Sequence, residues 1–251
     1  MIGLLRVALI AIPATIWYGS LIIWAAFRRS PELPCRCEEI PRKWARLLLR
    51  AAGAQVVLEN PERIDPDRPQ ILVANHVSWF DVLALAGHIP GKYRFVAKKE
   101  LANVPFFGPA WRACGHISID RKDINSAIQS LAEARRKLEE ECPTVVLFPE
   151  GTRSRNGELR TFKKGAFVLA IQTGVEVIPT ALVGTREVMP AGGWGIRRGR
   201  TIRVRFGEPL SVEGMKMEDR DALTRRARAA VAALLDGPGE DEHQTQSDNQ
   251  A

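Results

Sequence analysis

After residue 54, two kinds of hydrophobic pattern alternate along the chain. Short runs rich in β-branched and aromatic residues predict strands, and longer runs with apolar positions three and four residues apart predict helices. The predicted strands cover residues 55–60, 70–75, 93–98, 116–120, 144–149, 177–184 and 201–207. The predicted helices cover residues 79–88, 105–114, 124–141, 163–173 and 218–235.

Several of these strands are apolar throughout, which is typical of a sheet that helices cover on both faces. The alternation of strands and helices therefore predicts an α/β fold with a mixed, largely parallel sheet flanked by helices. Ligands of such sheets gather beyond the carboxyl ends of the strands. The chain divides into an N-terminal helical segment over 1–53, the sheet domain over 54–235 and a Gly-rich, acidic tail over 236–251 that we expect to be disordered.

The N-terminal segment contains 21 consecutive uncharged residues, Val7 to Phe27. About 20 apolar residues span a bilayer core, whereas a signal peptide has an apolar region of about 7 to 15. A buried helix of a soluble protein is the other alternative, but no polar position marks a solvent face. We therefore interpret the segment as membrane-associated. Pro13 and Gly19 leave open whether it crosses the membrane or re-enters it.

The charges that flank this segment predict its orientation. Only Arg6 precedes it, and seven basic residues follow it: Arg28, Arg29, Arg36, Arg42, Lys43, Arg46 and Arg50. The positive-inside rule then places the bulk of the chain on the cytoplasmic face of the cell inner membrane. Residues 41–54 form an amphipathic pattern, with Trp44, Leu47 and Leu48 on one face and Arg42, Arg46 and Arg50 near the other. Such a helix either lies on an anionic membrane surface or packs on the domain.

The net charge of +7 is unevenly distributed. The tail from Asp236 holds five of the 29 acidic residues and none of the 36 Lys and Arg residues, so the remainder carries +12. A basic surface suits anionic partners such as phospholipid headgroups, phosphate-bearing substrates or nucleic acid. An aromatic content of 7% and the lack of any DNA- or RNA-binding signature argue against nucleic acid.

Cysteine usage indicates neither a metal site nor a disulfide framework. Cys35 and Cys37 form a C-x-C pair, while Cys114 and Cys142 are isolated in apolar surroundings. No C-x-x-C motif and no histidine at zinc spacing accompany them. The pattern predicts reduced, structurally inert thiols in a protein that faces the cytosol.

The stretch NHVSWFD, residues 75–81, lies between two apolar runs and carries the first candidate chemistry. Ser78 and Asp81 have the spacing of a helix N-cap and its N3 carboxylate, a capping box. Because the chain folds back at a helix start, His76 and Asp81 can also meet there. A carboxylate on one imidazole nitrogen leaves the other free to take a proton from a hydroxyl. On this motif alone, the cap is the preferred role of Asp81.

No G-x-S-x-G nucleophile motif is present, so the hydroxyl would belong to a substrate. The stretch FPEGTRSRNGELRTFKKG adds five basic residues after a fully apolar strand: Arg153, Arg155, Arg160, Lys163 and Lys164. An arginine fork binds phosphate with a defined orientation. A solvated basic loop is the alternative. Because Glu150 and Gly151 directly follow the strand, we expect Arg153 to face inward.

Four segments in this order resemble the conserved blocks of the glycerolipid acyltransferases, most closely the bacterial 1-acyl-sn-glycerol-3-phosphate acyltransferases. They are NHVSWFD, then FVAKKELANVPFFG with GHISIDR after it, then FPEGTRS, and finally VIPTAL, which contains Pro179. The match covers about residues 70–185 and the membrane-proximal start, and the resemblance implies that residues 54–235 form an acyltransferase domain. The resemblance implies that His76 is the base and Asp81 its partner. It implies substrate contacts at Lys98 (or its neighbour Lys99), Arg121, Glu150, Gly151 and Arg153.

The resemblance also implies a reaction. A fatty acyl group would pass from acyl-CoA or acyl-carrier protein to the sn-2 hydroxyl of 1-acyl-glycerol 3-phosphate, giving phosphatidate. No metal or resident cofactor is expected, because the acyl donor is already activated. The amides at the helix start after Ser78 are candidate oxyanion donors. The expected partners are the lysophospholipid acceptor, the acyl donor and the membrane phospholipid surface.

Two alternatives stay open. The same chemistry could serve another acceptor, such as a lyso-ornithine lipid, another lysophospholipid or glycerol 3-phosphate. More distantly, the charge would permit a basic nucleic-acid-binding membrane protein.

Overall fold

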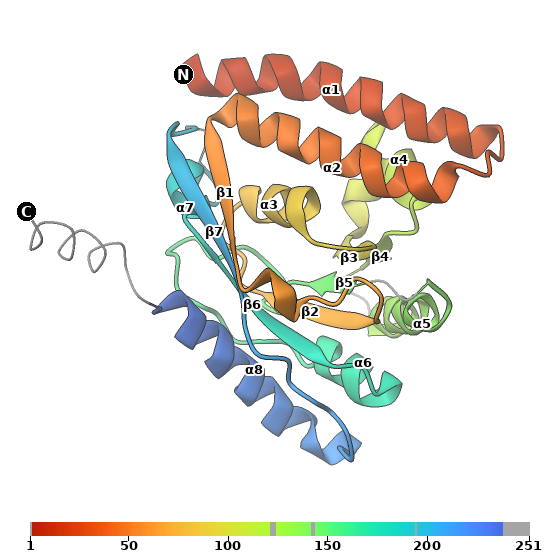
Figure 1. The fold of residues 1–251 in the computed structure, drawn as a ribbon, viewed down its shortest axis with the longest axis vertical. Coiled ribbons are helices and arrows are strands. Elements are labelled where there is room, and N and C mark those ends of the chain that lie inside the picture. Colours follow the sequence, from red (N-terminus) through yellow and green to blue (C-terminus); the bar gives the residue numbers. More distant parts are fainter. Residues whose placement is uncertain (1, 121–123, 142–143, 194, 238–251) are drawn as a thin grey trace, which may run out of the picture.

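The computed structural model describes residues 2–120, 124–141, 144–193 and 195–237. Its centre is a seven-stranded sheet with the order β1-β7-β6-β2-β5-β3-β4 (Figure 1). The strands are β1 (Ala54–Glu59), β2 (Gln70–Ala74), β3 (Tyr93–Lys98), β4 (Ile117–Ile119), β5 (Thr144–Leu147), β6 (Val177–Val183) and β7 (Arg200–Phe206). Each predicted strand is present with ends within two residues of the prediction.

The sheet is mixed and largely parallel, as predicted. The pairs β1–β7, β2–β5, β2–β6, β3–β4 and β3–β5 are parallel, and β6–β7 is antiparallel. Strand β2 lies between β5 and β6, and all five of its residues are buried. Its continuous apolar run follows from this position, because both of its faces are covered.

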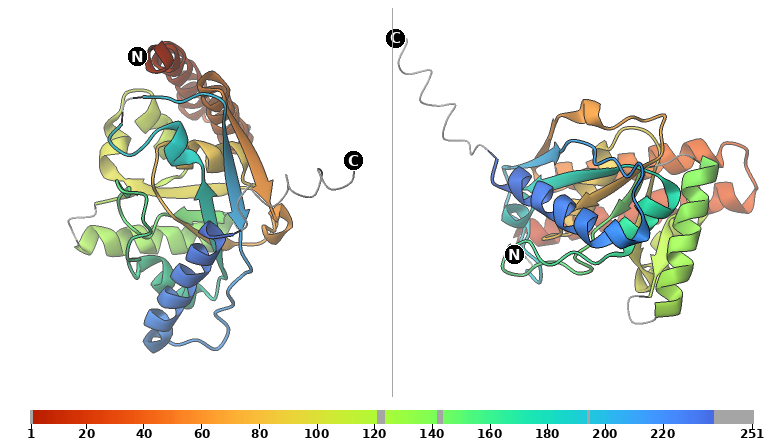
Figure 2. Two further views of the ribbon diagram at one scale, coloured as in Figure 1. Left: turned by 90° about the vertical axis from the view of Figure 1, so that its left-hand side faces the viewer. Right: turned by 90° about the horizontal axis from the view of Figure 1, so that it is seen from below.

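Helices cover both faces of the sheet (Figures 1 and 2). One face carries α2 (Leu33–Ala52), α3 (Phe80–His88), α4 (Phe107–Ala113) and the short α7 (Thr185–Val188); the other carries α5 (Ile124–Glu141), α6 (Gly165–Thr173) and α8 (Arg220–Leu235). Successive side chains along each strand point to opposite faces of the sheet, so they pack into two separate cores. Leu72 belongs to the core under α3, and its neighbour Ile71 to the core under α6. Short 3-10 turns occupy Pro61–Arg63, Lys99–Asn103 and Met217–Asp219.

Helix α1 (Ile2–Phe27) forms an outer layer alongside α2 (Figure 1). Residues Ala8–Phe27 are long and apolar enough to cross a membrane, by length and composition alone. The inner side of α1 packs on α2 and α4: Trp44 Nε1 donates to Thr15 Oγ1 at 3.0 Å, and a side chain at Gly19 would meet the Phe106 carbonyl at 2.9 Å. The outer side leaves large apolar residues exposed, namely Leu9, Ile12, Ile16, Trp17, Trp24 and Phe27.

The structure decides between the two interpretations of the second helix. Helix α2 begins at Leu33, eight residues before the predicted start, and buries Leu48 and Leu49 in the protein. Arg46 Nε donates to the Gly87 carbonyl at 2.7 Å, and Arg42 donates to carbonyls just beyond the end of α3. Two of the arginines expected on a polar face therefore bind the C-terminal end of α3, where cations are favourable. The apolar face of α2 packs on the domain.

The prediction of inert, reduced thiols is wrong for two of the four cysteines. Cys37 of α2 and Cys114, just after α4, form a disulfide with a Cα–Cα distance of 5.1 Å. They are 77 residues apart in sequence, so only the packing of α2 beside α4 brings them together. Cys35 is exposed and unbonded. Cys142 and residues 238–251, which contain most of the predicted disordered tail, lie outside the described residues.

Candidate active site

The loop between β2 and α3 positions the His–Asp pair. Helix α3 begins at Phe80 with Trp79 at its N-cap, one residue later than the predicted cap at Ser78. Ser78 still organises this turn, because its hydroxyl accepts from the Phe80 amide at 3.1 Å and donates to the Met189 carbonyl at 2.6 Å. The amide of Phe80, one of the proposed oxyanion donors, is therefore already engaged.

Asp81 holds the turn that precedes α3 and is also the partner of His76. Its buried Oδ2 accepts from His76 Nδ1 at 2.7 Å, from the Val77 amide at 2.7 Å and from the Ser78 amide at 2.8 Å. An ionised carboxylate only accepts hydrogen bonds, so this contact assigns the proton to Nδ1 of the neutral imidazole. The lone pair of Nε2 is then available to take a proton, and the role of Asp81 is more than that of a cap.

His76 is fixed by the loop that follows β5 as well as by its own loop. Its ring stacks on Phe148 with a centroid distance of 4.1 Å. Its amide donates to Glu150 Oε1 at 2.7 Å, and its carbonyl accepts from the Ser154 amide at 2.8 Å. Strands β2 and β5 are parallel neighbours, so their carboxyl ends bring the two loops together.

Glu150 faces into the protein and only 4% of it is exposed. Its second oxygen accepts from the Arg160 amide at 3.2 Å. Burial raises the pKa of this carboxyl, while the amides of His76 and Arg160 lower it. Glu150 thus joins the base to the basic loop, and we assign it a positioning role. The next residue, Gly151, has φ +74°, a left-handed conformation that favours glycine.

Arg153 lies at the mouth of the site. Its guanidinium carbon is 4.9 Å from the centroid of the Trp79 ring, a cation–π contact that orients the fork. No ion pair with an acidic side chain is present for it in the described part of the chain. Sequence reasoning missed Trp79 and Phe148. Both stand inside the recognised segments, but only the three-dimensional contacts reveal their roles.

Of the other basic residues predicted near the substrate, some line the pocket beside His76 and others do not. Lys98 ends β3, lines the pocket beside His76 and pairs with Glu100 at 2.8 Å, whereas Lys99 pairs with Asp120. Arg121 lies outside the described residues. Arg155 and Arg160 line a smaller pocket formed by residues 152–160, and Lys164 pairs with Asp221 of α8 at 2.8 Å.

A largely apolar pocket of about 910 Å³ opens beside His76 and Arg153. It extends between α1, α2, α3, α4 and β3, and aromatic side chains form much of its wall: Tyr18, Trp44, Tyr93, Phe95, Phe107 and Trp111. These residues are scattered over four elements, so no local pattern could have grouped them. A cavity of this size and polarity next to a base suits a hydrocarbon chain. Among the described residues, no group of three or more His, Cys, Asp or Glu side chains could hold a metal ion.

Comparisons with known proteins agree with this geometry. The family model described as Acyltransferase matches residues 55–183. The chain is 35% identical over 170 residues to a chloroplastic 1-acyl-sn-glycerol-3-phosphate acyltransferase of Arabidopsis thaliana, covering 68% of this chain and 46% of that protein. It is 32% identical over 224 residues to the 1-acyl-sn-glycerol-3-phosphate acyltransferase alpha of Bos taurus, covering 87% and 78%.

The crystal structure of the 1-acyl-sn-glycerophosphate acyltransferase PlsC from Thermotoga maritima superposes with a TM-score of 0.80 and 26% identity, over 95% of this chain and 97% of that one. The match to the plant and algal relatives is partial, since it spans about half of their length. The fold, including the two N-terminal helices, is thus similar to that of a whole solved acyltransferase.

Proposed function

This chain belongs to the acyltransferase family, and from that premise we propose that it transfers a fatty acyl group to the sn-2 hydroxyl of 1-acyl-glycerol 3-phosphate. The donor is acyl-CoA or acyl-carrier protein, and the product is phosphatidate. One observation carries the proposal: the hydrogen bond between His76 Nδ1 and Asp81 directs the proton-accepting Nε2 of a base that lines a large apolar pocket, with Arg153 on the same wall.

The reaction follows from this arrangement. The acceptor hydroxyl gives its proton to His76 Nε2 as its oxygen attacks the thioester carbonyl, and Asp81 stabilises the imidazolium that forms. A tetrahedral intermediate results. Its collapse breaks the carbon–sulfur bond, and the imidazolium returns the proton to the departing thiolate. His76 ends neutral and ready for the next turnover.

The acyl chain of the donor and the glycerol phosphate of the acceptor bind in different surroundings. The acyl chain enters the apolar pocket, whose wall excludes water from the thioester. The glycerol phosphate binds near Arg153, because a guanidinium held over Trp79 presents two parallel donors to phosphate oxygens. Lys98 also lines the pocket, where it pairs with Glu100. Arg121, in the second block of the resemblance, completes the set of cations we propose for the acceptor.

We further propose that α1 holds the enzyme in one leaflet of the inner membrane with the sheet domain on the cytoplasmic side. The exposed side of α1 is apolar, while its other side packs against α2. Helix α2 exposes charged residues such as Lys43 and Arg50, and these cannot enter a bilayer core. A helix that lies beside such a partner is better placed to sink its outer face into the lipid than to cross it. Tyr18 and Ile22 of α1 also line the pocket, which puts the site beside the lipid acceptor.

The proposal is tested with the full-length protein in phospholipid vesicles. The acceptor panel contains 1-acyl-glycerol 3-phosphate, a lyso-ornithine lipid, a lysophosphatidylcholine and glycerol 3-phosphate, each with acyl-CoA and with acyl-carrier protein. Mass spectrometry of the products should show phosphatidate from the first acceptor, and the His76→Ala variant should show none above background. Preferential acylation of any other acceptor would overturn the substrate assignment while keeping the chemistry.

A further inference from the structure

His116 occupies the end of the large pocket that is far from His76. It stands directly before β4, is 8% exposed and lines the pocket. The Phe95 amide of β3 donates to His116 Nδ1 at 3.1 Å. Phe95, Val146 of β5 and Leu72 of β2 lie in one register across the sheet.

The pairing of these strands gives an estimate of the separation between His76 and His116. His76 lies four residues beyond Leu72, which at ~3.3 Å per residue is roughly 13 Å further along the strand direction. Strand β3 is two places from β2 in the sheet, which adds roughly 10 Å across it. A chain whose reactive carbonyl sits at His76 would therefore reach His116 with its middle or its distal half.

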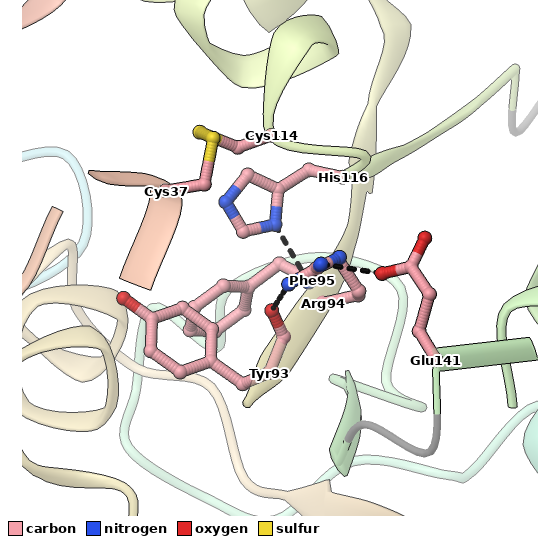
Figure 3. Close-up of a disulfide and its surroundings, with 7 residues drawn as sticks. All are labelled: Cys37, Tyr93, Arg94, Phe95, Cys114, His116 and Glu141. Atoms are coloured by element: carbon pink, nitrogen blue, oxygen red, sulfur yellow. Dashed lines mark hydrogen bonds and ion pairs between the residues drawn. A yellow bond between two sulfur atoms is a disulfide. The ribbon is translucent and has the colours of Figure 1, made fainter. Parts of the chain in front are cut away.

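The protonation state of His116 follows from its contacts. Burial, helped by the positive charges of Arg94 and Lys137, lowers the pKa of the ring to about 3, so the imidazole is neutral. Because Nδ1 accepts from Phe95, the single proton is on Nε2. Figure 3 shows Nε2 on the side of the ring away from Arg94 and Glu141, which form an ion pair with each other.

The Nε2–H group has no hydrogen-bond acceptor among the described residues. The ring packs on Trp111 at a centroid distance of 4.2 Å, and the nearby Tyr93 hydroxyl donates its own proton to the Ala86 carbonyl. The Cys37–Cys114 disulfide lies on the same side (Figure 3). His116 lines the pocket, and a donor there that has no protein acceptor favours a ligand that brings one.

We propose that His116 forms a polar subsite in the otherwise apolar pocket and recognises acyl chains that carry a hydroxyl group in their middle or distal half. The Nε2–H donates to the hydroxyl oxygen. An unsubstituted chain still fits, but it leaves this donor unpaired, so the subsite discriminates between the two. This inference rests on the proposed acyltransferase function and adds the class of donor.

The test is a competition between two donors in one reaction. Octadecanoyl-CoA and an octadecanoyl-CoA with a mid-chain hydroxyl compete for 1-acyl-glycerol 3-phosphate in vesicles, and mass spectrometry gives the ratio of the two products. Replacing His116→Leu should lower the hydroxylated share about threefold to tenfold, the worth of one neutral hydrogen bond. Transfer of the unsubstituted chain should continue.

Two further variants control for the change in shape. His116→Gln keeps an acceptor for the Phe95 amide and a donor for the ligand, and it should restore much of the ratio. His88→Leu removes an imidazole that is not among the pocket residues and should leave the ratio at the wild-type value. The same product ratio in wild type and in a folded His116→Leu protein would overturn the inference. A water molecule, and not the acyl hydroxyl, would then be the acceptor for Nε2–H.

A second measurement needs no variant. In the wild-type enzyme, kcat/KM is compared for a series of hydroxylated donors whose hydroxyl moves from the carboxyl end to the distal half. The subsite predicts a maximum at one deep position, and a monotonic or flat profile would contradict it. If the wild type fails to transfer even octadecanoyl-CoA, the proposed function fails instead, so the two failures are distinguishable.

Discussion

At the residue scale, Asp81 combines two functions that the sequence presented as alternatives. Its Oδ2 holds the turn before α3 and the imidazole of His76 at once. In Asp81→Asn the amide oxygen can still accept from backbone amides, but a neutral group cannot balance an imidazolium and can favour the wrong tautomer. We expect turnover to fall by about 10²–10⁴-fold, with about 1 kcal/mol or less lost from the free energy of unfolding.

Steady-state kinetics and thermal melts of the same preparation check this expectation. His76→Ala should lose a similar amount of activity, and the double variant should lose little more, because the pair acts as one unit. Full activity in Asp81→Asn together with lowered stability would mean that the carboxylate serves the helix alone.

Arg153 presents a second prediction at this scale. Its fork is positioned by Trp79 and has no acidic partner in the described chain, so it is free for phosphate. Arg153→Ala should raise the KM for the phosphorylated acceptor by about tenfold or more, since a hydrogen bond to a charged group is worth about 1.5–3 kcal/mol. Arg153→Lys should rescue this only in part, because lysine lacks the planar fork. An unchanged acceptor KM in a folded Arg153→Ala protein would remove Arg153 from the phosphate site.

At the element scale, α8 supports the basic loop from outside the four segments that resemble the acyltransferase blocks. Arg228 Nε donates to the Arg160 carbonyl at 3.1 Å and its Nη2 donates to the Leu159 carbonyl at 2.8 Å. Arg228→Ala should raise the acceptor KM by about twofold to tenfold with little change in kcat, because two hydrogen bonds from the guanidinium to backbone carbonyls of a binding loop are lost. Arg226→Ala, an exposed change on the same helix, is the matched control. Equal KM values in both variants would show that the basic loop keeps its conformation without the hydrogen bonds from Arg228.

The disulfide is a link between elements, because it joins α2 to the residue after α4. Closing a loop of 77 residues stabilises a chain by roughly 4 kcal/mol in the loop-entropy model. Reduction, or Cys37→Ser, should therefore lower the melting temperature, and peptide mapping without reductant should recover a Cys37–Cys114 cross-link. Exposed Cys35→Ser should leave both results unchanged. Free thiols at both positions in the isolated protein would contradict the bond.

At the scale of the whole molecule, the outer face of α1 is the proposed contact with the membrane. The double change Trp17→Glu and Trp24→Glu alters exposed side chains without touching the packing against α2. It should abolish co-sedimentation with anionic vesicles after a high-salt wash, because a charge at hydrocarbon depth costs about 2.5–3.5 kcal/mol per residue. Val57→Glu changes an exposed apolar residue of β1 and serves as the control. Wild-type binding by the double variant would place the membrane contact elsewhere.

The sequence by itself determined most of the elements and placed His76 and Asp81 close together. Strand and helix periodicities are local, so the strands and five of the six helices described in the sheet domain were found with small errors at their ends; the four-residue α7 was missed. The spacing of Ser78 and Asp81 placed His76 and Asp81 at one helix start for the same reason. The two residues are five positions apart, so the local turn of the chain decides whether their side chains meet. The order of the four segments indicated the chemistry.

Tertiary structure alone decided everything that depends on partners distant in the chain. The Glu150 carboxylate joins two loops, Arg42 caps α3 and Cys37 bonds to Cys114, and each contact joins residues tens of positions apart. The unpaired Nε2–H of His116 became visible only when α2, α3 and α4 closed the pocket around it. The physical reason is that the spacing of apolar residues along the chain predicts whether a side chain is buried. The packing of the whole molecule determines which residues it is buried against.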